Sequence, residues 1–379
     1  MQSNTTTASR ATEIFRSRTK TLPQRFFISR EIFAEERAKI FSAHWLLVGH
    51  RNQVPNAGDY FLATVADESL IIIRDSRSEI RAFYNVCRHR GTRLKEHRAG
   101  EAVCGHMSAI QCSYHAWTYG LDGDLIGAPH MDDVPGFDKA DYPLHPVNLG
   151  LWEGFIFVNL ETNPIPLEKW FTPLAGKFPH WNMPILQSAQ RIEYDVQANW
   201  KLMFENYSEC YHCPGVHPQL QKVSPYDSAE NDLREGPFLG GFMKINPGKS
   251  LTMSGNACAS FVGQIENLQR VFYYSIFPNM LLSLHPEYVM VHQLWPQSPE
   301  RTLIVCDWFF HPDAFKRSDF KPKDAIEFWD ITNKQDWHVC ELSQQGIASR
   351  AYAPGPYSAR ESIPAAWDEY YLRHMAASK

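Results

Sequence analysis

The chain has 379 residues, of which 44% are hydrophobic and 21% charged, and its formal net charge is -5. This length allows two or three domains, and the small negative charge gives no reason to expect binding to nucleic acid or to an anionic membrane. Eight cysteines are spread along the chain without a recognisable signal peptide, which is not the pattern of a disulfide-stapled secreted domain. We expect a cytoplasmic protein with neither a membrane nor a nucleic acid as partner.

Residues 1–40 are expected to form an N-terminal arm and a helix that packs against the C-terminal part of the chain. The first segment is rich in Ser, Thr and Arg, which fits a flexible arm or an organellar transit peptide, and we favour the arm. Apolar residues at helical spacing from Ser29 to Trp45 predict one amphipathic helix.

Residues 41–163 alternate strand-like runs with polar turns, which predicts a small antiparallel β-domain. Prolines are frequent between residues 161 and 184 and mark a domain boundary. Residues 164–379 contain further strand-rich runs, followed by helical spacing from residue 320 to residue 347. We therefore expect an α+β protein whose second domain is an antiparallel sheet that grips a long C-terminal helix.

Two short motifs in the β-domain each pair one thiol with one imidazole. They are Cys87-x-His89 and Cys112-x-x-His115, and glycines follow both closely. Two Cys and two His could bind a structural zinc, or a Rieske [2Fe–2S] cluster in which Cys ligands serve one iron and His ligands the other. Zinc fingers usually group Cys with Cys and His with His, so the mixed loops favour the cluster.

A second group of candidate ligands lies near the start of the C-terminal domain. A helix through residues 205–212 would place Glu209 and His212 on one face. A Pro-Gly pair would break this helix and let His217 turn toward the same ion. Two His with one carboxylate and open positions are the ligand set of O₂-activating Fe(II). Zinc is the alternative, because two cysteines flank His212.

These motifs resemble those of Rieske non-haem iron ring-hydroxylating oxygenases and their N-demethylating relatives, large (alpha) subunit. The match includes AFYNVCRHRGTRL, CSYHAWTYGLDG, AHWLLVGHRNQVPNAGDY and the spacing E-x-x-H-x-x-x-x-H that begins at Glu209. The resemblance implies a Rieske domain at residues 41–163, which holds a [2Fe–2S] cluster. It also implies a helix-grip catalytic domain at residues 164–379, which holds a mononuclear Fe(II).

The resemblance assigns the cluster ligands. They would be Cys87, His89, Cys112 and His115. The stretch between the two motifs is longer than is usual in the family and contains a second pair, Cys104-x-His106, which could compete for the cluster. We interpret this stretch as a surface insertion.

The resemblance also assigns the iron site. The iron ligands would be His212, His217 and Asp336, with Asp330 and Glu341 as competitors for the third position. Glu209 would bridge electron transfer from a cluster histidine, across a subunit interface.

A member of this family would act as a terminal oxygenase that uses O₂ to hydroxylate a small molecule. The chain has no GxGxxG fingerprint after a strand, so the flavin and nicotinamide sites are expected on a separate NAD(P)H-dependent flavin/iron-sulfur reductase, with or without a ferredoxin. The family's homotrimer would set the cluster of one subunit beside Glu209 of the next.

The segments ENYSECYHC and GPYSARESIPAAW resemble the branch that oxidises quaternary ammonium compounds such as choline, glycine betaine or carnitine. This implies hydroxylation of an N-methyl group with release of formaldehyde. Aromatic residues make up 13% of the chain and could supply a cage for such a cation, although most are expected in the core. The alternatives are a hydroxylase or dioxygenase of an aromatic or heteroaromatic acid, and a Rieske electron carrier without oxygenase activity.

Overall fold

The computed structural model describes residues 20–96, 104–259 and 268–376. The protein is α+β with antiparallel sheets, which confirms the expected fold class. The chain divides into two compact units, of which the smaller contains Arg37–Ala175 and Met183–Ile185, and the larger contains the other described residues. The boundaries therefore fall after residues 36 and 175, where the sequence suggested 40 and 163.

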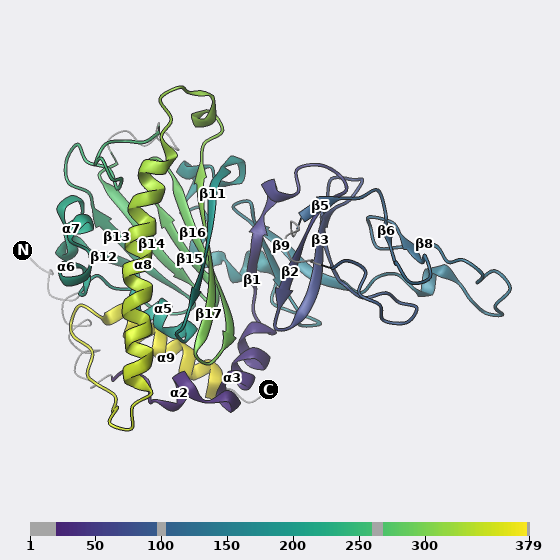
Figure 1. Cartoon of the computed structure of the whole chain (residues 1–379), viewed down its shortest axis with the longest axis horizontal. Coiled ribbons are helices and arrows are strands. Elements are labelled where there is room, and N and C mark those ends of the chain that lie inside the picture. The colour runs from purple at the N-terminus through teal and green to yellow at the C-terminus, as the bar shows by residue number, and fades with distance from the viewer. Residues whose placement is uncertain (1–19, 97–103, 260–267, 377–379) are drawn as a thin grey trace, which may run out of the picture. The chain divides into compact units, whose positions relative to one another are not determined.

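The smaller unit contains two antiparallel sheets (Figure 1). The larger sheet has the spatial order β1 (Leu46–His50), β10 (Phe155–Asn159), β9 (Pro146–Trp152), β4 (Ile80–Tyr84), β3 (Glu68–Arg74), β2 (Asp59–Val65) and β5 (Cys104–His106). The other consists of β6 (Ile110–Gln111), β7 (Thr118–Tyr119) and β8 (Leu125–Gly127), and a short helix, α4 (Leu167–Trp170), follows later in the chain. One hydrophobic cluster joins Ile71 and Phe83 of the first sheet to Trp117 and Tyr119 near the second.

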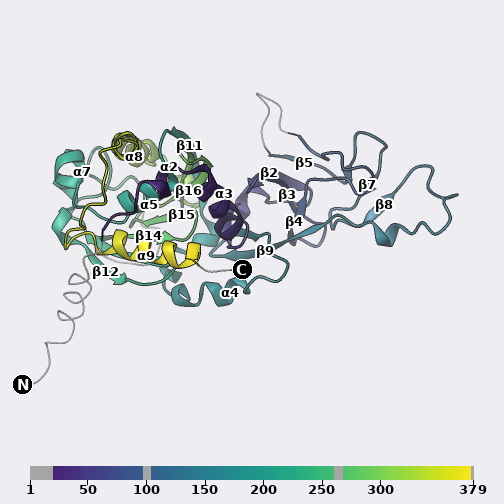
Figure 2. The ribbon, with the colours of Figure 1, turned by 90° about the horizontal axis from the view of Figure 1, so that it is seen from below.

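The larger unit is one antiparallel sheet with helices. Its strand order is β11 (Gln187–Val196), β17 (Arg301–Phe310), β16 (Val289–Ser298), β15 (Met280–Leu284), β14 (Arg270–Ile276), β13 (Phe238–Lys244) and β12 (Glu230–Leu233). The long helix α8 (Pro322–Ile347) lies across one face of this sheet (Figures 1 and 2), as expected. The other helices are α2 (Arg25–Ile28), α3 (Arg30–Glu36), α5 (Trp200–Tyr207), α6 (Cys213–Val216), α7 (Pro218–Val223) and α9 (Ser362–Ala376).

The buried residues of α8 recur every three or four positions, which gives the helix one apolar face for the sheet. Its other face carries charged and polar residues, so its length does not make it a membrane span. Within the described parts of the chain, no helix combines the length and the apolar character needed to cross a membrane.

The single helix predicted from Ser29 to Trp45 is wrong in its bounds. Ser29 separates α2 from α3, and its hydroxyl accepts the N–H of Ile32 at 3.2 Å, which caps the start of α3. After α3 the chain widens into a π-helix, Arg37–Phe41. The N–H and hydroxyl of Ser42 both donate to the carbonyl of Arg37, each at 2.9 Å, and this bonding ends the helical segment before β1.

A buried ion pair ties three helices of the larger unit together. Nζ of Lys201 on α5 lies 2.5 Å from Oε1 of Glu36 on α3, and these side chains are 0% and 1% exposed. Trp200 Nε1 donates to the other oxygen of Glu36 at 2.9 Å, and the hydroxyl of Tyr371 on α9 donates to Oε1. The carboxylate is therefore fully engaged, and α5 is held in the position from which the following loop departs.

Replacing Lys201 with Met should lower the free energy of unfolding by about 3–5 kcal/mol, because it leaves Glu36 buried without its cation. Urea denaturation followed by circular dichroism measures this loss. The double variant Glu36→Gln/Lys201→Met should recover part of it. The control Arg301→Ala removes an exposed pair with Asp195 and should cost less than about 1 kcal/mol. A loss no larger than this control in Lys201→Met would contradict the prediction.

Candidate metal centres

Two loops of the smaller unit share one pattern of backbone hydrogen bonds. In each, the N–H of the cysteine, Cys87 or Cys112, donates to the carbonyl five positions later at 2.8 Å. The cysteine carbonyl accepts from the N–H four positions later, at 3.0 Å from Gly91 and 3.1 Å from Ala116. Both of these residues have positive φ, 73° and 57°. Each loop therefore closes into a tight turn that carries a histidine.

The two thiols and the two imidazoles of these loops differ in burial. Cys87 and Cys112 are 3% and 2% exposed and belong to one hydrophobic cluster, whereas His89 and His115 are exposed. The two imidazole centroids lie 4.7 Å apart, and the ring of His89 stacks on Trp117 at 4.8 Å. This donor set fits a [2Fe–2S] cluster with buried Cys ligands on one iron and surface His ligands on the other.

Tyr119 contacts the buried end of this donor set. Its hydroxyl accepts the N–H of Arg88 at 3.0 Å and lies 3.3 Å from Sγ of Cys87. Burial raises the pKa of Tyr119, so the hydroxyl keeps its proton and can donate it to the sulfur. Hydrogen bonds to ligand sulfurs tune the reduction potential of such clusters. No spacing in the sequence indicated this tyrosine.

The competing pair Cys104-x-His106 lies in strand β5 and not in a tight turn. Cys104 pairs with Phe61 of β2, and His106 pairs with Asp59. Nδ1 of His106 lies 2.9 Å from Oδ1 of Asp59, so a carboxylate already engages this imidazole. Residues 97–103 of the same insertion lie outside the described residues.

The expectation that Glu209 and His212 share a helix is wrong. Helix α5 ends at Tyr207, and both residues lie in the loop that follows. The N–H of Ser208 still bonds back to α5, but its hydroxyl forms a 2.7 Å hydrogen bond with the hydroxyl of Ser275 on β14. This anchor to the sheet lies where the chain leaves the helix.

The expectation that Pro214 breaks a helix is wrong, because Pro214 lies in the first turn of one. Helix α6 begins at Cys213, directly after its N-cap residue His212, and Pro214 is the second residue of the helix. A proline is well accommodated there because the first turn needs no N–H donor. His217 then separates α6 from α7. Both imidazoles therefore lie at helix starts or ends, where the chain changes direction.

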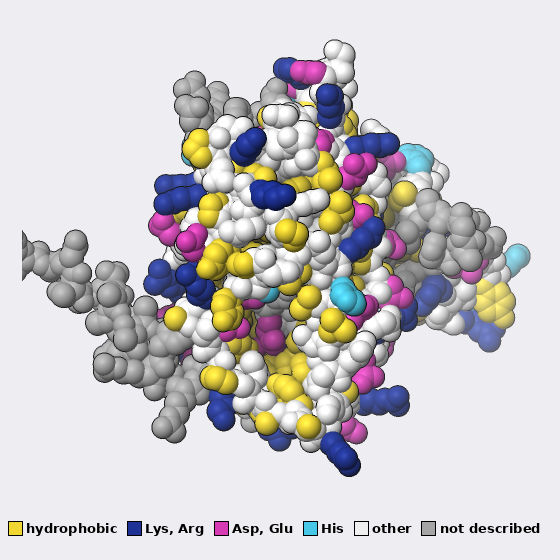
Figure 3. Space-filling view, turned by 60° about the vertical axis from the view of Figure 1, so that its left-hand side comes forward, with side chains coloured by type: hydrophobic (Ala, Val, Ile, Leu, Met, Phe, Trp, Pro, Cys, Tyr) yellow, Lys and Arg dark blue, Asp and Glu magenta, His cyan; other side chains and the backbone are white. Residues whose placement is uncertain are grey.

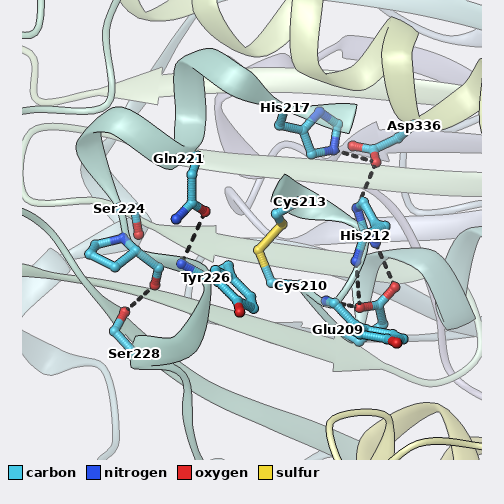
Figure 4. The surroundings of a disulfide bond; sticks show 12 residues. Glu209, Cys210, His212, Cys213, His217, Gln221, Ser224, Tyr226, Ser228 and Asp336 are labelled. Atoms are coloured by element: carbon cyan, nitrogen blue, oxygen red, sulfur yellow. Dashed lines mark hydrogen bonds and ion pairs between the residues drawn. A yellow bond between two sulfur atoms is a disulfide. The ribbon is translucent and has the colours of Figure 1, made fainter. Parts of the chain in front are cut away.

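The structure brings His212 and His217 together with Asp336 of α8 (Figure 4). One ligand atom from each lies within 4.8 Å of the others. Oδ1 of Asp336 is 2.8 Å from Nε2 of His217 and 3.2 Å from Nε2 of His212. The three side chains are largely buried, with His217 only 2% exposed. Two imidazole nitrogens and one carboxylate oxygen that converge in this way fit an Fe(II) ion.

A second hydrogen bond orients each imidazole. Nδ1 of His212 donates to Oε1 of Glu209 at 2.5 Å, and Nδ1 of His217 donates to Oε1 of Gln335 at 2.8 Å. Both Nε2 atoms are thereby left for Asp336 or for a metal ion. Sequence reasoning missed Gln335, whose only signal is its position beside Asp336.

The protonation of this group without a metal follows from its contacts. Burial opposes a charge on His212, but hydrogen bonds with Asp336 and Glu209 raise its pKa to about 10. Burial also opposes ionisation of Asp336, yet its hydrogen bonds with the two histidines hold the pKa of the carboxyl below its ordinary value. A proton on His212 thus balances the buried carboxylate, and a bound cation would replace that proton.

The competing carboxylates on α8 have other partners. Asp330 accepts the hydroxyl of Tyr194 at 2.9 Å through one oxygen and the ammonium of Lys334 at 2.6 Å through the other. Glu341 accepts a backbone N–H near the end of β11 at 3.0 Å. Of the three acids considered from the sequence, Asp336 is the one whose carboxylate meets both imidazoles.

The two cysteines that flank His212 form a disulfide with each other (Figure 4). The Cα atoms of Cys210 and Cys213 lie 5.0 Å apart. Neither sulfur is then a thiolate that could bind zinc, so the zinc alternative loses its two cysteine donors. The bond also closes a short loop around His212.

The three converging side chains line a cavity of ≈ 290 Å³ in the larger unit. Five of its rings form a continuous series that we call the aromatic wall: Trp329, Tyr273, Tyr207, His292 and Trp337. Their successive centroids lie 6.3, 5.9, 6.3 and 5.8 Å apart. Figure 3 shows a hollow with an acidic side chain in it and hydrophobic side chains around it. The wall draws on four separate elements, so no local spacing predicted it.

Comparison with known proteins identifies both units. Residues 44–138 match the model of the Rieske [2Fe–2S] domain, and residues 185–377 match that of the ring-hydroxylating alpha subunit, catalytic domain. The chain is 32% identical to the glycine betaine monooxygenase oxygenase subunit of Chromohalobacter salexigens, over 89% of this chain and 81% of the relative. It is 30% identical to the carnitine monooxygenase oxygenase subunit of Escherichia coli K12, over 88% and 85%.

A solved structure of a Rieske oxygenase has the same fold. A quaternary ammonium Rieske monooxygenase, studied for carnitine oxidation and inter-subunit electron transfer, superimposes with a TM-score of 0.81 at 26% identity. The match covers 94% of this chain and 96% of that one.

Because His292 is buried in the cavity lining, the free energy of unfolding should be sensitive to mild acid. Burial lowers the pKa of His292 from 6.5 to about 4, while its Nε2 lies 3.3 Å from Oδ1 of Asn333. In the unfolded chain this side chain takes up a proton near pH 6.5, whereas in the folded chain it does not. The stability that His292 contributes is therefore fully present above that pH and is lost as the pH falls toward 4. Between about pH 7.5 and pH 5 this loss amounts to about 2 kcal/mol.

Urea denaturation of wild type and of His292→Gln at the two pH values measures this contribution. The variant should lose about 2 kcal/mol less than wild type over that interval. His180→Gln, at an exposed position, should behave as wild type. Equal losses in wild type and His292→Gln would show that His292 is not neutral in the folded protein.

Proposed function

Because this chain belongs to the Rieske non-haem iron oxygenases, as an alpha (catalytic) subunit, we propose that it hydroxylates an N-methyl group of a quaternary ammonium compound. The family carries a Rieske [2Fe–2S] cluster and a mononuclear iron, so the protein is an oxygenase and not a simple electron carrier. The observation that carries the substrate proposal is the aromatic wall, which lines the same cavity as the converging His and Asp side chains.

We assign the cluster to the two matching loops of the smaller unit. Its ligands are Cys87, His89, Cys112 and His115. The support is the repeated turn geometry, the buried thiols and the adjacent exposed imidazoles. The iron belongs to the larger unit, with His212, His217 and Asp336 as ligands, supported by the convergence of their donor atoms within 4.8 Å.

When bound, the two metal centres supply the electron transfer and O₂ activation that no side chain can provide. The surrounding residues provide geometry. Glu209 and Gln335 accept hydrogen bonds from Nδ1 of His212 and of His217 respectively, which keeps both Nε2 atoms directed at the iron position. We also assign Glu209 to the electron path between subunits, since it contacts an iron ligand directly and remains 11% exposed.

The aromatic wall favours a cationic substrate. Tyr and Trp rings attract alkylated ammonium groups through their faces, and the attraction grows when water is excluded. His292 adds no opposing charge, because burial lowers its pKa to about 4. The carboxylate of Glu209, which is not a proposed iron ligand, adds negative charge to the same cavity. Relatives named for glycine betaine and carnitine agree with this choice.

The reaction then consumes O₂, two protons, and two electrons from a separate flavin/iron-sulfur reductase, directly or through a ferredoxin. One oxygen atom enters the substrate and the other leaves as water. Hydroxylation of the N-methyl group gives an N-hydroxymethyl cation. Its C–N bond breaks to release formaldehyde, a proton and the demethylated amine. The chain works as a homotrimer in this proposal.

The function is tested by supplying the purified protein with NADH, a surrogate reductase, and either glycine betaine, carnitine, γ-butyrobetaine, choline or an aromatic acid. At least one quaternary ammonium compound should give formaldehyde in proportion to O₂ consumed, because hydroxylation of an N-methyl carbon ends in its release. A boiled-protein control sets the background. A diol or phenol formed from the aromatic acid, without formaldehyde from any ammonium compound, would instead support the aromatic-acid hydroxylase.

Metal analysis separates a ligand from a residue of the electron path. Wild type should contain about three irons per chain, two of them in the cluster. Asp336→Ala should retain only the two cluster irons and lose turnover, because the third protein ligand is missing. Glu209→Gln should retain all three and still lose most turnover. Full activity in Glu209→Gln would remove it from the electron path, and three irons in Asp336→Ala would remove it from the ligand set.

Mixed assemblies test the trimer. Glu209→Gln subunits and Cys87→Ala subunits, each inactive alone, should regain activity when assembled together, since an intact cluster of one subunit then faces an intact Glu209 of the next. Sedimentation velocity gives the oligomeric state independently. No recovery from a verified mixed trimer would place electron transfer within one subunit.

A further inference from the structure

One exposed arginine lies along the lining of the cavity. Of the described residues that line it, Arg360 is the only Lys or Arg. It precedes α9 and lies on the segment that follows α8. The lining acids are Glu209 and Asp336, both at the proposed iron site. Arg360 therefore comes from a different segment of the chain than either lining acid.

The guanidinium of Arg360 has no carboxylate partner within the described residues. It lies over the ring of Tyr226, with 5.0 Å between its Cζ and the ring centroid. The neighbouring acid, Glu361, is engaged elsewhere, because its Oε2 accepts the N–H of Ser358 at 2.7 Å. Tyr226 thus supports one face of the guanidinium and leaves its N–H groups available.

We propose that Arg360 binds the carboxylate of the substrate, so that the enzyme acts on betaines, which carry a quaternary ammonium group and a carboxylate. This inference rests on the proposed function and specifies its substrate class. A guanidinium can hold a carboxylate through two parallel hydrogen bonds, which no hydroxyl group can match. Choline, which has a hydroxyl in place of the carboxylate, lacks this interaction.

The charges of the cavity set the direction in which a betaine binds. The aromatic wall and the carboxylate of Glu209 attract the ammonium end and repel a carboxylate. Arg360 attracts the carboxylate and repels the ammonium end. The N-methyl groups are therefore directed to the proposed iron site, and the reversed orientation is unfavourable at both ends.

The test compares Arg360→Gln with wild type, as holoenzymes with a surrogate reductase. KM for the best betaine among glycine betaine, γ-butyrobetaine and carnitine should rise about 10- to 100-fold, the range for one charge-assisted hydrogen-bonded contact. KM for choline should change much less. The kcat for the betaine should change little, because the contact is the same in the ground state and the transition state. Calorimetric titration with the same betaine should give a matching rise in Kd.

Three further variants control the comparison. Arg360→Lys keeps the charge but not the paired hydrogen bonds and should show a smaller rise in KM. Tyr226→Leu removes the support beneath the guanidinium and should weaken betaine binding without affecting choline. Arg317→Gln alters an exposed arginine that pairs with Asp319 outside the cavity lining, and should match wild type.

The outcomes separate this inference from the function on which it rests. If wild type oxidises no quaternary ammonium compound, the proposed function fails. If wild type oxidises betaines, but Arg360→Gln changes KM for betaine and choline equally or changes neither, the function stands and the carboxylate assignment is overturned. A wild-type preference for choline over every betaine overturns it too. A selective rise for betaines, with partial retention in Arg360→Lys, supports it.

Discussion

One oxygen of the Asp336 carboxylate connects two parts of the larger unit that are distant in sequence. It lies within hydrogen-bond distance of Nε2 of both His212 and His217. A buried carboxylate is costly unless a proton or a cation balances it, so the loop after α5 and the middle of α8 must keep a fixed relation. The sheet beneath α8 and the contact between α5 and α8 provide that rigidity. The cavity is built around this meeting point.

In both units, a neighbouring polar side chain contacts a proposed metal ligand. Tyr119 places its hydroxyl 3.3 Å from Sγ of Cys87. In the larger unit, Glu209 and Gln335 accept hydrogen bonds from the Nδ1–H groups of His212 and His217. Such contacts decide which ligand atom faces the metal and how basic it is. Glu209, which we propose for electron transfer, therefore also orients the imidazole of His212, through which electrons would reach the iron.

The cavity combines three kinds of recognition along one surface. The carboxylate of Glu209 lies at the proposed iron site, neutral aromatic rings form the wall, and Arg360 is the only Lys or Arg among the described lining residues. An ammonium group is favoured by the first two, and an anion by the last. A molecule with both charges therefore has one favourable orientation. The selectivity would come from the order of these groups as much as from any single contact.

The sequence by itself determined the local parts of this protein. Ligands a few residues apart on one loop lie close in any fold, and period-two and helical patterns predict a β-domain followed by a sheet with a long helix. The tertiary structure alone decided the rest. Asp336 is 119 residues from His217, and the sequence favoured it over Asp330 and Glu341 only by resemblance, whereas the packing of α8 on the sheet brings its carboxylate to both imidazoles. The aromatic wall and Arg360 likewise come from separate elements, whose convergence no local spacing encodes.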